Sequence, residues 1–363
     1  MAQTETKEYH VLGLMSGTSL DGLDMAYCVF RLENKQWKYE ILHAQTRPYS
    51  AEWHYRLKDL ANQSAAIFAE TDTAYGRLMG ELALAFIHEH KINPNFIAAH
   101  GHTIFHQPNK NFTSQIGCGA ALSAITQLPV VNLFRNMDLA YGGNGAPLVP
   151  VGDLHLFPNE EACLNLGGIA NISVYKESSM QAFDISPCNL VLNKLAETLG
   201  KSYDEDGLIA SKGIVSHELV AQLKQLNYYS IKGPKSLGIE WIQEQFWPIV
   251  DAYPELHAAD KLASLVEHIA SQIAIVIEQQ GLNKVLVSGG GALNQYLIQQ
   301  IQSKTKATIQ LPDNLTIHFK EALIFAFLGV LRIRNEINVF KEVTGATQSH
   351  IGGALWGNFN IKQ

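Results

Sequence analysis

Glycine-rich turns that also carry hydroxyl and carboxylate side chains are the features of this 363-residue chain best suited to chemistry. The first has the sequence GLMSGTSLDGLD over residues 13–24. Glycines let backbone N–H groups approach an anion, and hydroxyls such as those of Thr18 and Ser19 can hold phosphate oxygens. Asp21 and Asp24 can orient a metal ion or a water molecule. No Gly-Lys-Ser/Thr follows, so this is not a Walker A loop, and Asp-Gly is equally typical of a plain hairpin turn.

A second turn, SGGGALN over residues 288–294, lies between a strand-like run and a helical run. This order suits a nucleotide held close to the N-terminus of a helix. The alternative is a tight strand-to-helix connection, which rarely requires three glycines. The pattern therefore favours a ligand at Gly289, Gly290 and Gly291.

The third turn contains Gly167 and Gly168, and Asp184 follows near the end of an apolar strand. A carboxylate at the end of a strand beside a cleft is suited to act as a general base. An Asp in this setting also commonly accepts hydrogen bonds from the amides of its own turn. From the residues alone, the structural role is the slightly favoured one.

The fourth segment, residues 132–150, contains Arg135 and the run GGNGAPLVP, and His100-Gly101-His102-Thr103 precedes it. Its amides, hydroxyls and single arginine suit the recognition of sugar hydroxyls or of a small carboxylate. An ordered loop with a local Arg135–Asp138 salt bridge explains the composition equally well.

Metal and hydrolase signatures are weak. His100, His102 and His106 form the densest group of the 14 histidines, and the turn expected at Gly101 argues against a shared strand face. No Gly-x-Ser-x-Gly elbow supports serine hydrolase chemistry. The four cysteines include no CxxC pair, and reduced thiols suit the cytoplasm.

Two similar series of elements position these turns. The first is a meander of strands over residues 9–15, 23–31 and 38–47, then a helix over 72–90 and a strand over 96–99. The second has strands over 162–166, 172–175 and 181–185 and a helix over 190–199. Later elements are helices over 216–226, 260–280, 292–304 and 320–335, and a strand over 284–288. Two meanders followed by helices predict two α/β lobes with a cleft between them.

The lobes are expected to comprise residues 1–130 and 131–363, with the C-terminal tail packing back on the first lobe. The glycine- and proline-rich stretch 142–150 is the best candidate for a junction or hinge between lobes, or else it is a binding loop. A formal charge of −7 argues against binding to nucleic acid. The polar N-terminus does not resemble a signal peptide, and the apolar run 322–331 is too short to span a bilayer. We expect a cytoplasmic protein with no membrane partner.

Taken together and in this order, the motifs resemble the anhydro-N-acetylmuramic acid kinase family of the actin-like sugar kinase superfamily. They are GLMSGTSLDGLD, His100 to Thr103, GGNGAPLVP, NLGGIANI, Phe183 to Asn189 and Ser288 to Asn294. The resemblance runs from about residue 9 to about residue 355. Its most specific part is GLMSGTSLDGLD followed by GGxGAPLVP.

The resemblance implies a bilobal actin-like ATPase/sugar kinase fold with ATP and Mg²⁺ in a central cleft, and a homodimer. Asp184 matches the family's catalytic carboxylate, while His102, Arg135 and Asn144 are expected on the sugar side. No metal ligand is assigned. The residues implied in nucleotide binding are Gly17, Thr18, Ser19, Leu20, Asp21, Gly22, Leu23, Asp24, Gly167, Gly168, Gly289, Gly290, Gly291 and Asn294.

In the family the base activates a water that attacks the anomeric carbon of 1,6-anhydro-N-acetylmuramate. The anhydro bond opens and the 6-oxygen takes the γ-phosphoryl group of ATP, which gives N-acetylmuramate 6-phosphate in peptidoglycan recycling. This chain departs from the usual pattern, which has Gln at His102, Asp at Leu133 and Gln at Asn144. The loss of a carboxylate at position 133 removes a polar group that can orient Arg135.

Two further departures lie in the turn after Asp184, where Ser186 and Cys188 replace glycines and restrict the backbone. The changes lie mostly on the sugar side and bear on the identity of the substrate. Two alternatives follow: a kinase of another anhydrosugar such as levoglucosan, and a nucleotide-binding module without turnover.

Overall fold

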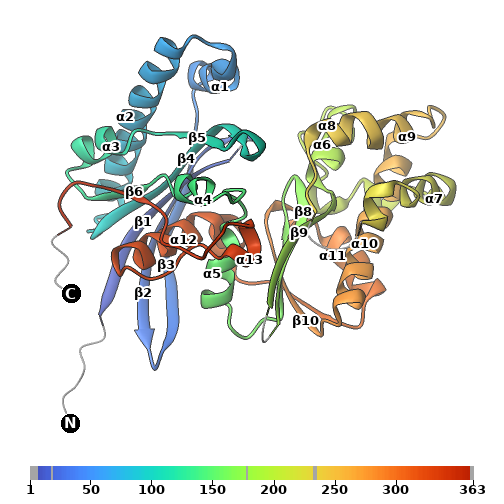
Figure 1. The fold of residues 1–363 in the computed structure, drawn as a ribbon. Coiled ribbons are helices and arrows are strands. Elements are labelled where there is room, and N and C mark those ends of the chain that lie inside the picture. The colour runs from blue at the N-terminus through green and yellow to red at the C-terminus, as the bar shows by residue number, and fades with distance from the viewer. Residues whose placement is uncertain (1–6, 18, 177–178, 232–234, 360–363) are drawn as a thin grey trace. The chain divides into compact units, whose positions relative to one another are not determined.

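The computed structural model describes residues 7–17, 19–176, 179–231 and 235–359. The chain divides into two compact α/β units. Unit 1 comprises residues 1–158 and 319–363, and unit 2 comprises residues 159–318. Each unit has its own sheet and its own apolar core, which agrees with the prediction of two α/β lobes (Figure 1).

Unit 1 is built on a sheet that, in the described part of the chain, has the strand order β12-β6-β4-β1-β2-β3, with β5 paired to β4. The first three strands form the predicted antiparallel meander, whereas β4 runs parallel to β1. The strands are β1 (Glu8–Ser16), β2 (Gly22–Glu33), β3 (Gln36–Pro48), β4 (Phe96–Gln107), β5 (Phe112–Ile116), β6 (Val130–Asn132) and β12 (Ala354–Trp356).

The helices of unit 1 cover this sheet. Ser64 caps the long helix α2, since its hydroxyl accepts a hydrogen bond from the Ile67 N–H at 3.3 Å. The helices are α1 (Ala51–Asp59), η1 (Leu60–Asn62), α2 (Ala65–His90), η2 (Pro108–Lys110), α3 (Gly119–Thr126), α4 (Asn136–Ala140), α5 (Val149–Leu156), α12 (Asn314–Ile333) and α13 (Lys341–Thr344).

Helix α12 begins in unit 2 and continues into unit 1. It packs closely on β1, because a Cβ on Gly13 would lie 2.2 Å from the Ala322 carbonyl oxygen. By length and mean hydropathy (1.4) α12 is a candidate membrane span, but 72% of its apolar window is buried inside the protein. That burial is typical of a core helix.

Unit 2 has the strand order β11-β10-β7-β8-β9 among its described residues. Its strands are β7 (Ala162–Leu166), β8 (Ile169–Lys176), β9 (Ser179–Pro187), β10 (Lys284–Ser288) and β11 (Thr308–Gln310). Its helices are α6 (Asn189–Glu197), η3 (Glu205–Gly207), η4 (Ala210–Lys212), α7 (His217–Lys224), η5 (Asn227–Ser230), α8 (Ile239–Trp241), the π-helical turn η6 (Ile242–Phe246), α9 (Trp247–Asp251), α10 (Ala258–Gln280), η7 (Gly290–Leu293) and α11 (Gln295–Lys304).

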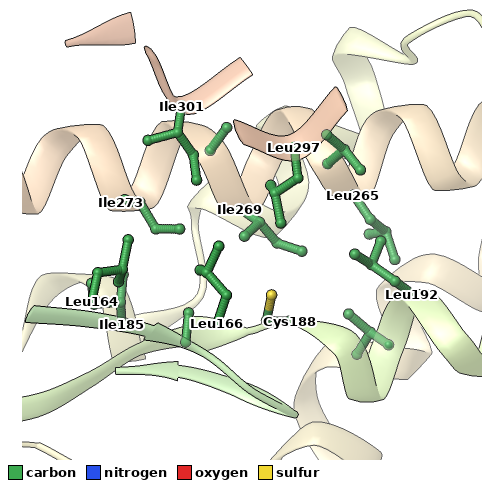
Figure 2. Close-up of a cluster of buried hydrophobic side chains, with 14 of the residues drawn as sticks. Leu164, Leu166, Ile185, Cys188, Leu192, Leu265, Ile269, Ile273, Leu297 and Ile301 are labelled. Carbon is green, nitrogen blue, oxygen red and sulfur yellow. The ribbon is translucent and has the colours of Figure 1, made fainter. Parts of the chain in front are cut away.

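The core of unit 2 lies between the sheet and helices α10 and α11. Figure 2 shows Ile269 and Ile273 of α10 above Leu164 and Leu166 of β7, with Cys188 in the same layer. All five side chains are at most 1% exposed. Their burial fixes the ends of β7 and β9, where the third turn and Asp184 lie.

The division between the units differs from the predicted boundary after residue 130. β6 pairs with β4 in the sheet of unit 1, and α5 packs on α12, where a Cβ on Gly152 would lie 2.6 Å from Ile324. The stretch 142–150 therefore belongs to unit 1, and the chain passes between the units at 158–159 and 318–319. The C-terminal segment does return to unit 1, since β12 pairs with β6.

Two local predictions were wrong. The turn expected at Gly101 is part of β4, which continues to Gln107 because it pairs with β1 and β5; Gly101 adopts a φ of 79° inside the strand. The helix expected from Ala292 begins only at Gln295, after the short turn η7.

Candidate functional site

The first glycine turn connects β1 to β2 in unit 1. Ser19 and Asp21 are exposed, and Leu20 adopts a positive φ of 61°. The Leu20 N–H bonds to the Gly17 carbonyl oxygen at 3.4 Å. Thr18 lies outside the described residues. The turn thus presents a hydroxyl and a carboxylate to solvent, as a phosphate- or cation-binding loop requires.

Gly17 and Gly22 of this turn differ in how much space a side chain would have. A Cβ on Gly22 would lie 2.3 Å from the Arg47 carbonyl oxygen, so β3 excludes any side chain there. Within the described part of the chain, which leaves out Thr18, a Cβ on Gly17 would meet only the Ser19 hydroxyl, at 3.5 Å. Packing therefore explains Gly22, whereas the open space at Gly17 suits the close approach of a ligand.

The end of the turn is held by the sheet. Leu23 is fully buried in the core of unit 1. Asp24 is partly buried, and its Oδ1 accepts a hydrogen bond from the Thr46 hydroxyl at 2.5 Å. Leu23 therefore has a structural role, and Asp24 is the second carboxylate at this end of β1.

His102 is part of a buried hydrogen-bond network next to the turn. Its Nδ1 lies 3.0 Å from the Ser16 hydroxyl, which also accepts a bond from the Tyr49 hydroxyl at 2.7 Å. His102 is 4% exposed and Tyr75, bonded to Tyr49, is fully buried. Burial lowers the pKa of His102 to about 4, so its ring is neutral at physiological pH. His102 supports the base of the first turn and presents little surface to a substrate.

Arg135 has partners other than those expected from its sequence neighbours. Its Nε and Nη2 lie 3.0 and 2.9 Å from His100 Nε2, and its Nη1 donates to the Gly145 carbonyl oxygen at 2.7 Å. These bonds supply the orientation that the missing carboxylate at Leu133 was expected to provide. Desolvation lowers the pKa of Arg135 to about 10, so the guanidinium stays charged at neutral pH.

Asp138 organises the glycine loop that follows Arg135. Its Oδ2 accepts a bond from the Gly145 N–H at 2.6 Å, and its Oδ1 from the Thr344 hydroxyl at 2.7 Å. Asp138 is fully buried, and its carboxylate fills the space where a side chain on Gly143 would lie. Asn144 is exposed, and its N–H bonds to the Thr344 carbonyl oxygen at 2.8 Å. The loop is thus fixed around Arg135 and leaves Asn144 at the surface.

Glu321 is a site residue that the sequence interpretation missed. It lies on α12, where its carboxylate interacts electrostatically with Arg135 and Asp24. Its side chain reaches solvent, yet desolvation by the surrounding protein raises its pKa. Arg135 attracts the Glu321 carboxylate, whereas the like charge of Asp24 repels it. Its only signal in the sequence is a charged Lys-Glu pair beside an otherwise apolar helical run.

The third turn lies in unit 2, where its carbonyl groups receive the N-terminus of α6. The Gly168 oxygen accepts bonds from the Cys188 and Leu190 N–H groups, and the Gly167 oxygen from the Asn189 N–H at 3.1 Å. The Asn189 Nδ2 donates to the Leu166 carbonyl oxygen at 3.0 Å. Asn189 thereby joins the end of β7 to the start of α6.

The triple-glycine turn follows β10 in the same unit. A Cβ on Gly289 would lie 2.4 Å from Asn165 Oδ1, and one on Gly291 would lie 2.7 Å from the Leu166 Cβ. Among the described residues, a Cβ on Gly290 would have only the Asn189 Nδ2 nearby, at 3.7 Å. Packing therefore requires two of the glycines and leaves open space at the third.

Two polar side chains flank this turn. Ser288 is fully buried, and its hydroxyl has no hydrogen-bond partner among the described residues. Such an orphaned buried hydroxyl beside an open glycine fits a polar ligand. Asn294 caps α11, since its Oδ1 accepts the Leu297 N–H at 2.9 Å. This bond explains Asn294 without a ligand.

Asp184 lies near the end of β9, opposite Asn171 of β8. Its Oδ2 accepts a bond from the Leu237 N–H at 2.8 Å, and its own N–H donates to the Lys235 carbonyl oxygen at 2.9 Å. Desolvation raises the pKa of Asp184, and the Leu237 bond partly offsets that rise. A partly buried carboxylate with one oxygen anchored is suited to accept a proton on the other.

No group of three or more His, Cys, Asp and Glu side chains arranged to hold a metal occurs in the described ranges. Mg²⁺ in phosphoryl-transfer sites commonly uses one or two carboxylates together with substrate phosphates and waters. The exposed carboxylate of Asp21 is compatible with that mode of binding.

Comparisons with known proteins agree on one family. The family model described as anhydro-N-acetylmuramic acid kinase matches residues 9–358. The chain is 33% identical to the enzyme of that name from Legionella pneumophila (strain Corby) over 95% of this chain and 97% of that one. It is 30% identical to the enzyme of the same name from Francisella tularensis subsp. novicida (strain U112), over 95% of this chain and 98% of that one.

Among solved structures, component A of the (R)-2-hydroxyglutaryl-CoA dehydratase of Acidaminococcus fermentans matches with a TM-score of 0.45. The identity is 12%, over 88% of this chain and 96% of that one. The family match and the two sequence relatives each extend over nearly the whole chain. On that evidence, the chain belongs to the anhydro-N-acetylmuramic acid kinase family.

Proposed function

We propose that the chain phosphorylates 1,6-anhydro-N-acetylmuramate with ATP while it adds water across the anhydro bond. A water oxygen bonds to the anomeric carbon, the water proton goes to Asp184, and the bond from that carbon to the 6-oxygen breaks. The 6-oxygen then bonds to the γ-phosphorus as the bridging bond to ADP breaks. The products are N-acetylmuramate 6-phosphate and ADP, as peptidoglycan recycling requires.

The state of Asp184 is the observation that carries this proposal. One carboxylate oxygen is fixed by the Leu237 N–H, and partial burial raises the pKa of the group. A raised pKa makes a carboxylate a stronger base, and fixed geometry lowers the entropic cost of reaching the transition state. The same unit supplies the Gly167–Gly168 turn and the open Gly290. A hydrolytic step followed by phosphoryl transfer needs such a base together with phosphate-binding turns.

Arg135 supports the choice of a carboxylate-bearing sugar. It stays protonated at neutral pH and is held by His100 and Gly145, so its orientation is set before a substrate binds. An arginine fork binds a carboxylate such as the lactyl group of the muramate sugar. A neutral anhydrosugar has no use for this charge.

The nucleotide is assigned to the glycine turns. The open space at Gly17 and at Gly290 admits backbone approach to phosphate oxygens, and the orphaned Ser288 hydroxyl offers a polar contact. Mg²⁺ would neutralise charge on the phosphates when bound. Asp21, exposed on the first turn, is our choice for its carboxylate contact.

An ADP-release assay with ATP and Mg²⁺ tests the substrate, with 1,6-anhydro-N-acetylmuramate and levoglucosan compared side by side. We expect turnover on the muramate sugar. In heavy-oxygen water, the label is expected at the anomeric hydroxyl of the product, because the water oxygen ends there. The product is read by mass spectrometry after a rapid quench.

Other outcomes identify the alternatives. Turnover on levoglucosan alone would keep the mechanism and reject the muramate substrate. Binding of ATP without phosphorylation of either sugar would favour a nucleotide-binding module. The departures at His102, Leu133 and Asn144 are the basis of the levoglucosan alternative, and the altered turn after Asp184, with Ser186 and Cys188, is the basis of the nucleotide-binding module.

We also propose that the protein acts in the cytoplasm as a homodimer. The four free cysteines support a reducing compartment, because none of them forms a disulfide in the structure. Light scattering coupled to gel filtration measures the oligomeric state, and a single monomeric mass at micromolar concentration would reject the dimer.

A further inference from the structure

A chain of three polar side chains, of which Tyr229 is half-buried, links the strand that carries Asp184 to helix α10. Ser186, two residues further along β9, is fully buried, and its hydroxyl lies 3.2 Å from the Tyr229 hydroxyl. The Tyr229 hydroxyl lies 2.8 Å from His268 Nε2. His268 belongs to α10 and is also fully buried. The network therefore connects the strand end that carries Asp184 to a core helix of unit 2.

The backbone at this strand end needs support from outside the sheet. β9 contains a bulge at which Asn171 pairs with Asp184 and Ala170 pairs with Ser186, so Ile185 is left as the extra residue. A bulge interrupts the hydrogen-bond ladder and redirects the neighbouring side chains. The pairing of β8 with β9 alone does not fix how Asp184 is aimed.

Two adjacent tyrosines of η5 supply the missing bonds. The Tyr228 hydroxyl donates to the Asp184 carbonyl oxygen at 2.7 Å, while Tyr229 bonds to Ser186. Tyr229 is held in turn by His268, whose ring packs against it at 5.0 Å. Burial lowers the pKa of His268 to about 3, so the imidazole is neutral and the network carries no charge.

Stability alone is a weak reason for this arrangement. A buried hydrogen bond between neutral groups contributes little more than an apolar contact of the same shape, while an unsatisfied partner is costly. Buried polar networks do, however, fix one geometry among several. Ser186 is also one of the two positions where this chain replaces a glycine of the usual family pattern. The replacement gives the turn a hydroxyl that can bond to Tyr229.

We propose that Ser186, Tyr229 and His268 are positioning residues, which hold the bulged end of β9 so that the Asp184 carboxylate faces the water it activates. This inference rests on the proposed role of Asp184 as the base. The three residues act through the backbone of β9 and do not contact the reacting atoms.

The Tyr229→Phe variant tests the network, because it removes one hydroxyl and leaves the ring packing in place. We expect kcat to fall about tenfold with the KM for ATP unchanged, the size of effect caused by a slightly misplaced catalytic group. If the end of β9 moves and the Leu237 N–H bond loosens, the pKa of Asp184 should rise further, because that bond holds the pKa down. That pKa is followed by NMR titration of labelled aspartate carboxyls, with Asp184→Asn used to assign the signal.

A matched pair at His268 separates hydrogen bonding from packing. In His268→Gln the side-chain amide can reach the position of Nε2, so kcat and the Asp184 pKa should stay near their wild-type values. In His268→Leu the bond is lost, and the variant should behave like Tyr229→Phe. Equal behaviour of the two His268 variants would contradict the proposal.

Ser264→Ala on the same helix is the control. Ser264 is fully buried, accepts the Ser216 N–H at 2.8 Å and donates to the Asp260 carbonyl oxygen at 2.7 Å. Its loss should lower the melting temperature without changing kcat or the Asp184 pKa. If Tyr229→Phe does the same as Ser264→Ala, the network only stabilises the fold and the proposal is wrong.

The titration separates this proposal from the proposed function, because it requires no sugar. A wild-type protein that phosphorylates neither sugar, combined with a raised Asp184 pKa in Tyr229→Phe, would reject the reaction and keep the network. Normal turnover of the muramate sugar by both proteins, with equal Asp184 pKa values, would keep the reaction and reject the network. If Tyr229→Phe does not fold, Ser186→Ala gives the same readouts with a smaller change in the core.

Discussion

At the scale of single residues, Asp184 shows how the environment sets the chemistry of a carboxyl group. Burial raises its pKa, and one backbone N–H limits that rise while it fixes one oxygen. The bond occupies one carboxylate oxygen and leaves the other for the proposed reaction. Without the Leu237 bond, the pKa of Asp184 would be higher still.

Asp184→Asn is expected to lower turnover at least about 100-fold, the usual contribution of a positioned general base. The amide keeps the shape of the side chain, so the affinity for ATP should stay close to wild type. ADP release measures turnover and calorimetry measures ATP binding. Near-normal turnover would remove Asp184 from the mechanism.

The pH dependence of kcat follows from the same group. As the proposed base, Asp184 would act as a carboxylate, and its raised pKa means that protonation begins at a higher pH than for an ordinary Asp. Activity is therefore expected to fall as the pH drops through this raised pKa. The acid limb of the kcat profile should lie above 3.8, the ordinary pKa of an Asp side chain. His102, with a pKa of about 4, is neutral over most of the working range. A pH profile of kcat in wild type and in His102→Gln should show the same acid limb.

Arg135→Ala is expected to raise the KM for the carboxylate-bearing sugar about tenfold or more, because a charge-assisted hydrogen bond contributes about 1.5–3 kcal/mol. The KM for a neutral anhydrosugar should change much less. Arg135→Lys is the control, because it keeps the charge and loses the planar fork. Its KM for the carboxylate-bearing sugar should lie between those of the wild type and of Arg135→Ala. Equal effects on both sugars would make Arg135 a structural residue.

At the scale of elements, the glycine turns combine packing and binding roles that their sequences do not separate. β7 approaches Gly289 and Gly291 so closely that no side chain fits, whereas Gly290 faces open space. β3 similarly excludes a side chain at Gly22 but not at Gly17. Packing against described residues therefore explains Gly22, Gly289 and Gly291, and we propose a ligand as the reason for Gly17 and Gly290.

Gly290→Ala and Gly291→Ala form a matched pair that tests this division. A methyl group at Gly291 overlaps the Leu166 Cβ at 2.7 Å and should reduce the free energy of unfolding by about 1–3 kcal/mol. A methyl group at Gly290 should leave stability unchanged and weaken ATP binding about tenfold, or about 1.4 kcal/mol. Urea unfolding and calorimetry measure the two effects. Unchanged ATP affinity in Gly290→Ala would exclude nucleotide approach at that glycine.

At the scale of the whole molecule, the chain forms two α/β units with separate cores. The chain leaves unit 1 after Pro158 and returns at Phe319. Next to these two crossings, Lys320 on α12 forms a buried ion pair with Asp153 on α5 at 2.7 Å. Its ammonium also lies 5.4 Å from the centre of the Phe157 ring.

Asp153→Asn is expected to destabilise unit 1 by about 3 kcal/mol, because it leaves a buried ammonium without its carboxylate. Hydrogen exchange should become faster in α5 and α12 and stay unchanged in α10, which has its own core. The variant Asp153→Asn/Lys320→Met removes both charges and should recover part of the loss. Equal acceleration in all three helices would mean that the two units unfold together.

The sequence alone determined the local elements and the positions of the glycine turns, because strand alternation, helical periodicity and turn chemistry depend on neighbouring residues. It also placed Asp184 at the end of a strand and identified the family. From the residues alone a structural role for Asp184 is slightly favoured, whereas the family resemblance predicts the catalytic role, which stays a proposal.

Only the tertiary structure decided which groups meet. His100 was predicted beside a turn, yet it lies in a strand and holds Arg135. Glu321, almost 200 residues from Arg135, interacts with it because α12 packs on β1. The pairing of β6 with β4 and the packing of α5 on α12 also moved the boundary between the units. These contacts join residues far apart in the chain, and no local spacing encodes them, since they depend on how whole elements bury their apolar faces against one another.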